Sequence, residues 1–244
     1  MLNKSLCFCL CTLLFFGCAT VPPPVLNLPQ KANVGIINLI DREATHTHIG
    51  TTAFNNFEKN YFVNWGYHEK TEKELIAEIQ KFPQFDVLSI EAPERIVKNE
   101  SEILNTAWNL KLNDDLVPDI AEIMKQHKID VLLIIRDGSG EDYMCATGRY
   151  LKNYGIYTRT FLGIKTTHAY VYSNIVGFYG NPPQYIGGAW LNEHYRLENF
   201  SYPSDIKEMD IAKLNEYGPL ITDNIPDFIK KAVIGVGLNP SEKR

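Results

Sequence analysis

The sequence has no basic run and no excess of positive charge. Its 24 Lys and Arg residues are outnumbered by 29 Asp and Glu residues, and the formal net charge is −5. Proteins that bind nucleic acid gather Lys and Arg to neutralise phosphates, so we do not expect nucleic acid as a partner. The sequence also shows no internal repeat with a period of about 20–50 residues, which argues against solenoid and propeller folds.

Long apolar runs are missing as well. The apolar run nearest the N-terminus extends only from Leu6 to Phe16, whereas a helix that spans a bilayer takes roughly 20 residues. Hydrophobic residues make up 45% of the chain and charged residues 22%, the mixture of an ordinary globular protein. This composition excludes a chain that is disordered throughout, a collagen-like repeat and a protein with several membrane spans. The 244 residues suffice for one large domain or two small ones.

The first residues have the pattern of a secretory signal. Lys4 precedes the apolar run, and small residues follow it. The end of the run, Leu14-Phe-Phe-Gly-Cys18, resembles the lipobox of bacterial lipoproteins, in which the Cys becomes the first residue of the mature protein and carries the acyl chains. The resemblance implies a signal peptide over residues 1–17 and lipidation with palmitate at Cys18. The alternative is an ordinary signal peptide that is cut near Ala19.

The residues after Cys18 indicate where the protein is held. By the sorting rules of the same family, Ala19 implies a lipid-anchored outer-membrane protein, which we expect to face the periplasm. Residues 18–30 would then form the acylated Cys and a tether, because four Pro residues stiffen this segment towards polyproline II. The alternative is an arm that lies on a partner subunit.

Cysteine is scarce in the predicted mature chain. Of five Cys residues, Cys7, Cys9 and Cys11 lie in the predicted signal peptide, and only Cys18 and Cys145 remain. If Cys18 is acylated, Cys145 has no partner within the chain, so we expect no disulfide. The role of Cys145 is left open, because a Cys acts as a nucleophile only beside a base and no His is adjacent to it in the sequence.

The body of the chain, residues 31–244, predicts a single α/β domain with a mixed β-sheet and helices packed on it. We expect the first two strands to form a hairpin, the Thr71–Glu74 capping box to begin the first helix, and residues 180–183 to form a turn between two antiparallel strands. The order of the elements loosely resembles that of the periplasmic domains of envelope and secretion lipoproteins, such as those of the curli-pore and TolB types. The predicted strands are 33–40, 44–54, 85–90, 129–135, 156–178 and 184–190, and the predicted helices are 71–83, 101–112, 114–128, 205–216 and 220–234.

His46 and His48 are the candidate metal ligands. Alternation along the predicted strand puts both imidazoles on one face. With His168 or Glu43 they would form a zinc site, which takes three or four ligands. No third ligand is evident from the sequence, and the alternative is a pair of outward-facing polar residues on an edge strand. We therefore predict no bound metal and no cofactor.

A second motif follows the predicted strand 129–135. Asp137-Gly-Ser139-Gly-Glu141 is similar to the metal-adhesion motif Asp-x-Ser-x-Ser of von Willebrand A domains. Glu141 stands where that motif has its last Ser, and that fold begins with this strand, whereas here the strand lies past the middle of the chain. We interpret the segment as a strand that enters a Gly-Ser turn.

Aromatic residues are dense between residues 178 and 202. Aromatic side chains build cores, but they are also enriched at interfaces, and the alternation of the sequence does not distinguish the two. We take four of them as candidates for partner binding: Trp190, Tyr195, Phe200 and Tyr202.

No arrangement of residues typical of acid–base, nucleophilic or phosphate chemistry is evident. We therefore predict a non-enzymatic, lipid-anchored outer-membrane lipoprotein that binds other envelope proteins as a component of an envelope or secretion assembly. One alternative is a lipid-anchored, metal-assisted hydrolase that uses His46 and His48. Another is a binder of a small ligand or glycan that uses the late aromatic residues.

Overall fold

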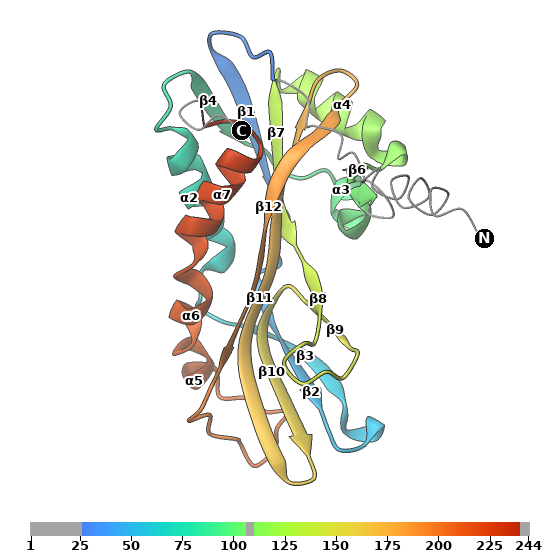
Figure 1. Ribbon diagram of the computed structural model, residues 1–244, viewed down its shortest axis with the longest axis vertical. Coiled ribbons are helices and arrows are strands. Elements are labelled where there is room, and N and C mark those ends of the chain that lie inside the picture. Colours follow the sequence, from blue (N-terminus) through green and yellow to red (C-terminus); the bar gives the residue numbers. More distant parts are fainter. Residues whose placement is uncertain (1–25, 106–109, 240–244) are drawn as a thin grey trace, which may run out of the picture.

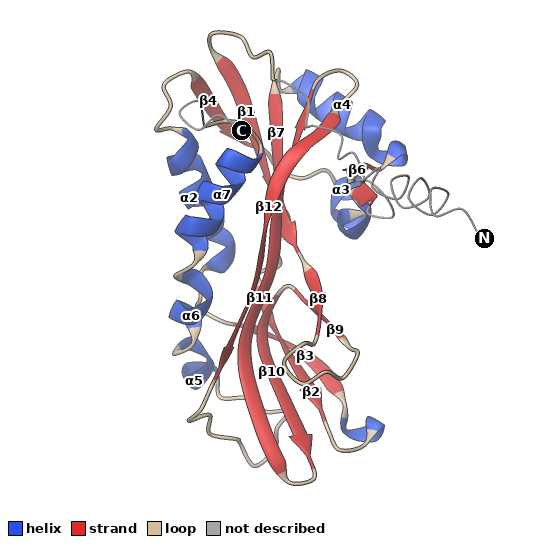
Figure 2. Ribbon diagram, viewed as in Figure 1, coloured by secondary structure: helices blue, strands red, loops and turns tan. Residues whose placement is uncertain are grey.

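One curled sheet extends along the whole length of the molecule, with helices on both of its faces (Figures 1 and 2). The computed structural model describes residues 26–105 and 110–239. The sheet has eight strands in the order β3-β2-β10-β11-β7-β1-β4, and β12 pairs with β11. These strands are β1 (Ala32–Asn38), β2 (Glu43–Ile49), β3 (Phe57–Phe62), β4 (Phe85–Ser89), β7 (Val131–Asp137), β10 (Tyr154–Phe161), β11 (Ile164–Tyr179) and β12 (Gln184–Arg196).

The long strand β11 joins the two halves of this sheet, because it pairs with β12, β10 and β7. One edge of β11 pairs with β12 along most of its length. The other edge pairs with β10 over residues 164–171 and with β7 over residues 173–179. Next to these lie β2, parallel to β10, and β1, parallel to β7. The sheet therefore divides at Tyr172 into one half built on β7 and another built on β10.

The chain leaves the sheet where it divides. The backbone N–H of Gly138 donates to Tyr172 O at 2.9 Å, and the N–H of Tyr172 donates to Asn153 O at 2.6 Å. The intervening residues form an excursion that carries the two-stranded ribbon β8 (Ser139–Glu141) and β9 (Tyr150–Lys152). Strands β7 and β10 are thus two consecutive segments along one edge of β11.

Helices cover both faces of the β7 half. One face carries α2 (Tyr67–Ile79) and α7 (Ile225–Gly235), with α5 (Ile211–Asn215) and α6 (Gly218–Thr222) continuing towards the β10 half (Figure 1). The other face carries α3 (Glu94–Lys98), α4 (Val117–Gln126), the short ribbon β5 (Leu104–Asn105) and β6 (Lys111–Leu112), and two 3-10 turns, η3 (Glu100–Glu102) and η4 (Asp114–Leu116). Along β7, Leu133 packs into the core under α7 and Leu132 into the core under α4. An uninterrupted apolar strand is what burial on both faces requires.

The predicted α/β fold class, one mixed sheet with helices packed on it, is confirmed. The predicted strand 85–90 and the helix 114–128 are also present, with small shifts at their ends. The antiparallel pair joined by residues 180–183 is present too, but the predicted single strand 156–178 is wrong, because a turn at residues 162–163 divides it into the antiparallel neighbours β10 and β11. None of the helices in the described ranges is long and apolar enough to cross a membrane.

The expected hairpin of the first two strands is wrong. Strand β1 pairs with β4 and β7, and β2 pairs with β3 and β10. Both strands lie antiparallel to β11, so the chain continues in one direction through Asp41 and does not reverse. The physical reason is burial: β1 is apolar on both faces and takes a central position between two parallel strands.

Two other local predictions are also wrong. The first helix begins at Tyr67, after Gly66 with φ 62°, and the Thr71 hydroxyl donates to Tyr67 O from inside the helix. The expected helix 101–112 is replaced, in its described residues, by η3, β5 and β6. In both places the signal was local, and tertiary packing overrode it.

The first described residues lie against the domain. The Tyr179 hydroxyl donates to Asn27 O at 3.0 Å and accepts from Asn27 N at 3.2 Å. Leu26 and Leu28 pack against the core under α7. This part of the predicted tether is therefore packed on the sheet, whereas residues 1–25, including Cys18, lie outside the described residues.

Candidate functional site

A cleft with a volume of about 640 Å³ crosses one face of the sheet at the place where the sheet divides. Residues of α3 and η3 line it on the side of the β7 half, and Ser139 and Lys152 of the β8–β9 ribbon line it on the side of the β10 half. Between them, its floor consists of side chains from β2, β3, β7, β11 and β12. The lining residues are Asp41, Thr45, Thr47, Glu58, Asn60, Val97, Lys98, Glu100, Ser101, Arg136, Asp137, Gly138, Ser139, Lys152, Asn153, Asn174, Trp190 and Asn192.

Arg136 is buried in the floor of the cleft. Its side chain lies in register with that of Asn174 on β11, and its Nε donates to Asn174 Oδ1 at 2.6 Å. Its Nη1 donates to Glu100 O at 2.7 Å. A guanidinium that is buried without hydrogen bonds would be costly, so these bonds hold η3 against the end of β7.

Asp137 follows Arg136 at the end of β7. Asp137 N donates to Glu100 Oε1 at 2.7 Å, and Asp137 Oδ2 accepts from Asp41 N at 3.1 Å. Burial raises the pKa of Asp137 to about 8, and the neighbouring carboxylates of Glu100 and Asp41 add to this rise. Burial also raises the pKa of Glu100. Asp137 is therefore largely protonated at neutral pH.

Access to this acid is restricted. The second oxygen of the Asp137 carboxyl group is buried and makes no hydrogen bond within the described part of the chain, and the same holds for Asn153 Oδ1. A protonated acid in a cleft is a common feature of functional sites. Here it lies beneath the surface and accepts the hydrogen bond from Asp41 N, while exposed residues such as Asp41 and Lys98 face the solvent.

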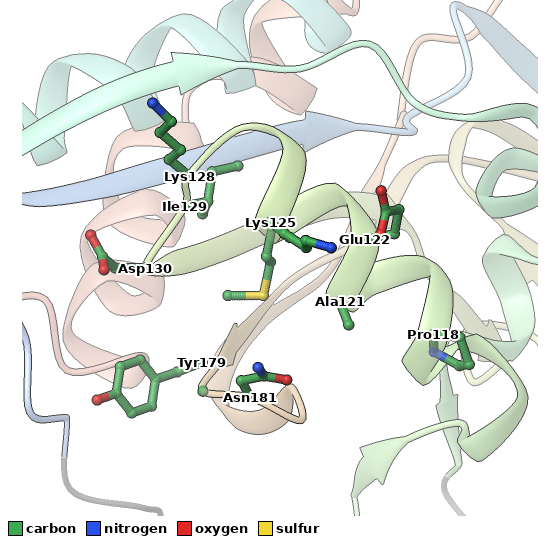
Figure 3. A pocket seen from close by; sticks show the side chains of 11 residues that line it. Pro118, Ala121, Glu122, Lys125, Lys128, Ile129, Asp130, Tyr179 and Asn181 are labelled. Atoms are coloured by element: carbon green, nitrogen blue, oxygen red, sulfur yellow. The ribbon is translucent and has the colours of Figure 1, made fainter.

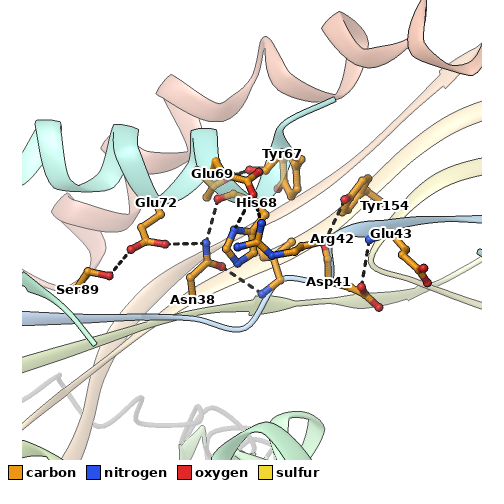
Figure 4. Close-up of polar contacts among 12 residues, drawn as sticks. Asn38, Asp41, Arg42, Glu43, Tyr67, His68, Glu69, Glu72, Ser89 and Tyr154 are labelled. Atoms are coloured by element: carbon orange, nitrogen blue, oxygen red, sulfur yellow. Dashed lines mark hydrogen bonds and ion pairs between the residues drawn. The ribbon is translucent and has the colours of Figure 1, made fainter. Parts of the chain in front are cut away.

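Helix α2 holds the link between β1 and β2, which positions Asp41 (Figure 4). The Asn38 side chain donates to His68 O at 2.9 Å and accepts from Ile40 N at 3.2 Å. The Tyr154 hydroxyl donates to Asp41 O at 3.1 Å. Because both sides of the link are fixed, the backbone N–H of Asp41 reaches Asp137.

The rim of the cleft carries an exposed indole. Trp190 lies on the edge strand β12 in register with Asn174, and 44% of its surface is exposed. Asn192 follows it on the same face of β12. Thr45 and Asn60 line the cleft from β2 and β3, towards the other edge of the sheet, and are joined by a 3.1 Å hydrogen bond. The cleft therefore offers an aromatic face, amides, hydroxyls and charges of both signs.

The two candidate metal ligands meet elsewhere, on the opposite face. His46 Nε2 and His48 Nδ1 lie 2.7 Å and 2.8 Å from the Thr158 hydroxyl, and both rings pack against Phe57. They are 1% and 5% exposed, and their strand lies between β3 and β10, so the outward-facing alternative is wrong. Burial, with His48 and Lys59 nearby, lowers the pKa of His46 to about 3.

The expected third ligands are not beside this pair. The register pairs His168 with Tyr157, one position from Thr158, so His168 lies on the other face of the sheet, and alternation along β2 puts Glu43 there too. Among the residues that the structure describes, no group of three His, Cys, Asp or Glu side chains is arranged to hold a metal ion. The histidine pair is a hydrogen-bonded part of the core.

The late aromatic residues divide into two groups. Trp190 is at the cleft, whereas Tyr195, Phe200 and Tyr202 are half-buried. The Tyr195 hydroxyl bonds to Asn224, Phe200 packs against the core, and the Tyr202 hydroxyl donates to Thr166 O at 2.9 Å. Cys145 is also half-buried, with its thiol 3.5 Å from the Thr166 hydroxyl.

A second hollow, of about 600 Å³, lies at the end of the molecule where β1 begins. The C-terminal part of α4 and the turn after β11 line it, with Lys125, Lys128 and Tyr179 among its side chains (Figure 3). It contains no buried polar cluster comparable to that around Asp137, so the cleft is the stronger candidate site.

The sequence analysis did not identify the residues of the cleft as a group. Asp137 was named there only for the similarity of residues 137–141 to the metal-adhesion motif, and Glu100, Asn153 and Asn174 come from distant segments. No local spacing links them, because strand register alone brings them together.

Comparisons with known proteins add little. No protein-family model matches the chain, and no curated protein matches it. Among solved structures, a hypothetical protein from Chlamydia trachomatis has a TM-score of 0.39 at 10% identity, over 86% of this chain and 99% of that chain. A putative neuraminyllactose-binding hemagglutinin homolog from Helicobacter pylori has a TM-score of 0.30 at 11% identity, over 86% and 91%. At these TM-scores neither structure carries an argument about function.

Proposed function

We propose that this protein is a lipid-anchored, non-enzymatic binding protein of the bacterial envelope, and that the cleft at the division of the sheet is its ligand site. The anchor rests on the Gly17-Cys18 signal in the sequence. The observation that carries the ligand site is the exposed indole of Trp190 at the rim of a cleft whose polar floor is held in place by buried hydrogen bonds.

Binding is favoured over catalysis by the way the acidic groups are used. Both Asp137 and Glu100 accept hydrogen bonds from backbone N–H groups, and one oxygen of Asp137 is sealed from solvent. A general acid or base must reach the proton that it transfers. These carboxyl groups instead fix the shape of the floor, which is the property that a preformed binding site needs.

The composition of the cleft favours a glycan as the ligand. An exposed indole face offers apolar contact to a sugar ring, and the amide of Asn192 with the hydroxyls of Thr45 and Ser139 offers donors and acceptors to sugar hydroxyls. The cleft extends from β3 to β12, which allows more than one sugar unit. A segment of a partner envelope protein is the second candidate, because an exposed Trp at a cleft is also a typical anchor for protein binding.

Trp190→Ala tests the site. We expect the substitution to lower the affinity for a bound oligosaccharide by about 10-fold or more, since such anchors contribute at least ~1.4 kcal/mol. The melting temperature should fall less than for a buried Trp, because 44% of the Trp190 surface is exposed. Tyr143→Ala is the matched control, since Tyr143 is 75% exposed and is not among the cleft-lining residues.

The measurement is a screen of the purified full-length protein against oligosaccharides and against envelope-derived peptides, followed by calorimetric titration of the hits. Glycan binding that is lost in Trp190→Ala supports the proposal. Peptide binding lost in the same variant would transfer the site to a protein partner. If every ligand binds the variant as tightly as the wild type, the cleft is not the binding site.

A further inference from the structure

Large apolar side chains are exposed together at one end of the molecule. The turn between β10 and β11 carries Leu162 and Ile164, which are 75% and 69% exposed, and Phe161, which is 47% exposed. The neighbouring link between β2 and β3 carries Phe54, which is 98% exposed. We call these four residues the apolar tip.

The two segments of the apolar tip lie side by side. The Thr51 hydroxyl donates to Thr160 O at 3.1 Å, and Phe54 and Thr160 line the same small hollow. In Figure 1 the β10–β11 turn lies at the bottom of the molecule, whereas the described chain begins at the top. Scattered exposed apolar residues need no explanation, but a group at the protruding end of a sheet does.

Positive charges surround the apolar tip. The Arg159 guanidinium lies 5.1 Å from the centre of the Phe161 ring, Lys165 Nζ lies 4.6 Å from the Tyr202 ring, and Lys207 Nζ lies 5.8 Å from the Phe57 ring. None of these three cations takes part in an ion pair within the described residues.

The acidic residues nearby have other partners. Glu208 pairs with Lys59 at 3.0 Å, and the Asp205 carboxylate accepts from the backbone N–H of Lys207 at 2.9 Å. The chain as a whole has a net charge of −5, yet three aromatic rings at this end of the molecule are each faced by a Lys or Arg side chain.

We propose that the apolar tip inserts into a lipid surface that contains anionic headgroups. Apolar side chains on a short turn reach the acyl boundary of a bilayer, and Lys and Arg around them meet the headgroups. Charge complementarity favours this occupant over a neutral surface. The site is separate from the cleft, and it lies at the opposite end of the molecule from the start of the described chain.

Tryptophan placed at the tip reports insertion directly. In the full-length protein, the fluorescence of Leu162→Trp should be quenched by vesicles of phosphatidylcholine and phosphatidylglycerol whose acyl chains are brominated, beyond the quenching of the native Trp residues in the wild type. Leu88→Trp is the matched control, because Leu88 is 44% exposed on the edge strand β4 in the other half of the sheet. It should show no added quenching if the apolar tip, and not the opposite end of the molecule, enters the vesicles.

A second arm removes the interaction. Leu162→Ser with Ile164→Ser should lower partitioning onto these vesicles by about tenfold or more, and Lys165→Glu should weaken the preference for phosphatidylglycerol. Combined with Leu162→Trp, the substitution Trp190→Ala should leave the added quenching at residue 162 unchanged, which separates this proposal from that of the cleft.

Absence of added quenching at residue 162 would overturn the proposal. Equal quenching by pure phosphatidylcholine vesicles would overturn the role of the cations. If the Ser variant instead loses a cross-link to an envelope protein, the apolar tip docks on protein and the lipid proposal is wrong.

Discussion

The histidine pair makes the stability of the protein depend on pH in a defined direction. In the unfolded chain His46 has the ordinary pKa of 6.5, and in the folded protein burial, followed by the nearby His48 and Lys59, lowers this pKa to about 3. Burial also lowers the pKa of His48. Folding therefore requires neutral imidazoles, and the unfolded state binds more protons below pH 6.5. The stability that the neutral pair allows is present above pH 6.5 and is lost as the pH falls from there towards 3.

The size of this effect follows from the two pKa values of His46. Between the two pKa values, each pH unit below 6.5 costs the folded state about 1.4 kcal/mol, and pH 5 lies about 1.5 pH units below 6.5. Lowering the pH from 7.5 to 5 should therefore reduce the free energy of unfolding by about 2 kcal/mol through His46 alone. Asp137 acts in the opposite direction, because burial raises its pKa to about 8, so a comparison of variants is needed to isolate His46.

The assay is urea unfolding followed by Trp fluorescence at several pH values, for the wild type and for His46→Gln. The variant is neutral at every pH, so the difference in unfolding free energy between the two proteins should change by about 2 kcal/mol between pH 7.5 and 5. His127→Gln is the matched control, since this exposed side chain stays in solvent and should follow the wild type. A difference that stays constant over this range, or an imidazole of His46 that titrates near 6.5 by NMR, would refute the reasoning.

Two further substitutions test the anchor and the close packing of the sheet. Cys18→Ala should abolish the uptake of labelled palmitate and release the protein from the membrane fraction, while Cys145→Ala should stay bound. The lipoprotein prediction is contradicted if Cys18→Ala remains in the membrane fraction and the wild type takes up no label. Gly155→Ala should cost about 3 kcal/mol or more, because the added Cβ would lie 1.9 Å from Thr45 O and would push β10 away from β2. Ile156→Val in the same strand should cost only about 1 kcal/mol, and equal urea midpoints for the two variants would show that the strands tolerate the extra methyl group.

Several features could be read from the sequence because their signals are local. The run 129–135 is apolar at every position but one, which predicted the central strand β7, buried on both faces. The apolar stripe over 114–128 predicted α4, and Gly180-Asn-Pro-Pro183 predicted the turn between β11 and β12. Alternation correctly placed His46 and His48 on one face, because the side-chain period of a strand is fixed by its backbone.

The tertiary structure decided which strands become neighbours, and with them the path of the chain at Asp41 and the position of the cleft. The link at Asp41 looked like a hairpin turn, yet the chain continues through it into another half of the sheet. The cleft exists because the chain leaves the sheet at Gly138 and returns at Asn153. It also depends on η3, a segment distant in the sequence, whose Glu100 carbonyl oxygen accepts a hydrogen bond from Arg136. Local sequence specifies backbone direction and the faces of a strand, but the pairing of distant segments is set by how all the apolar faces are buried at once. For that reason the sequence alone determined the buried strand β7, the helix α4 and the faces of β2, and only the folded sheet brought Asp137, Glu100 and Trp190 to one cleft.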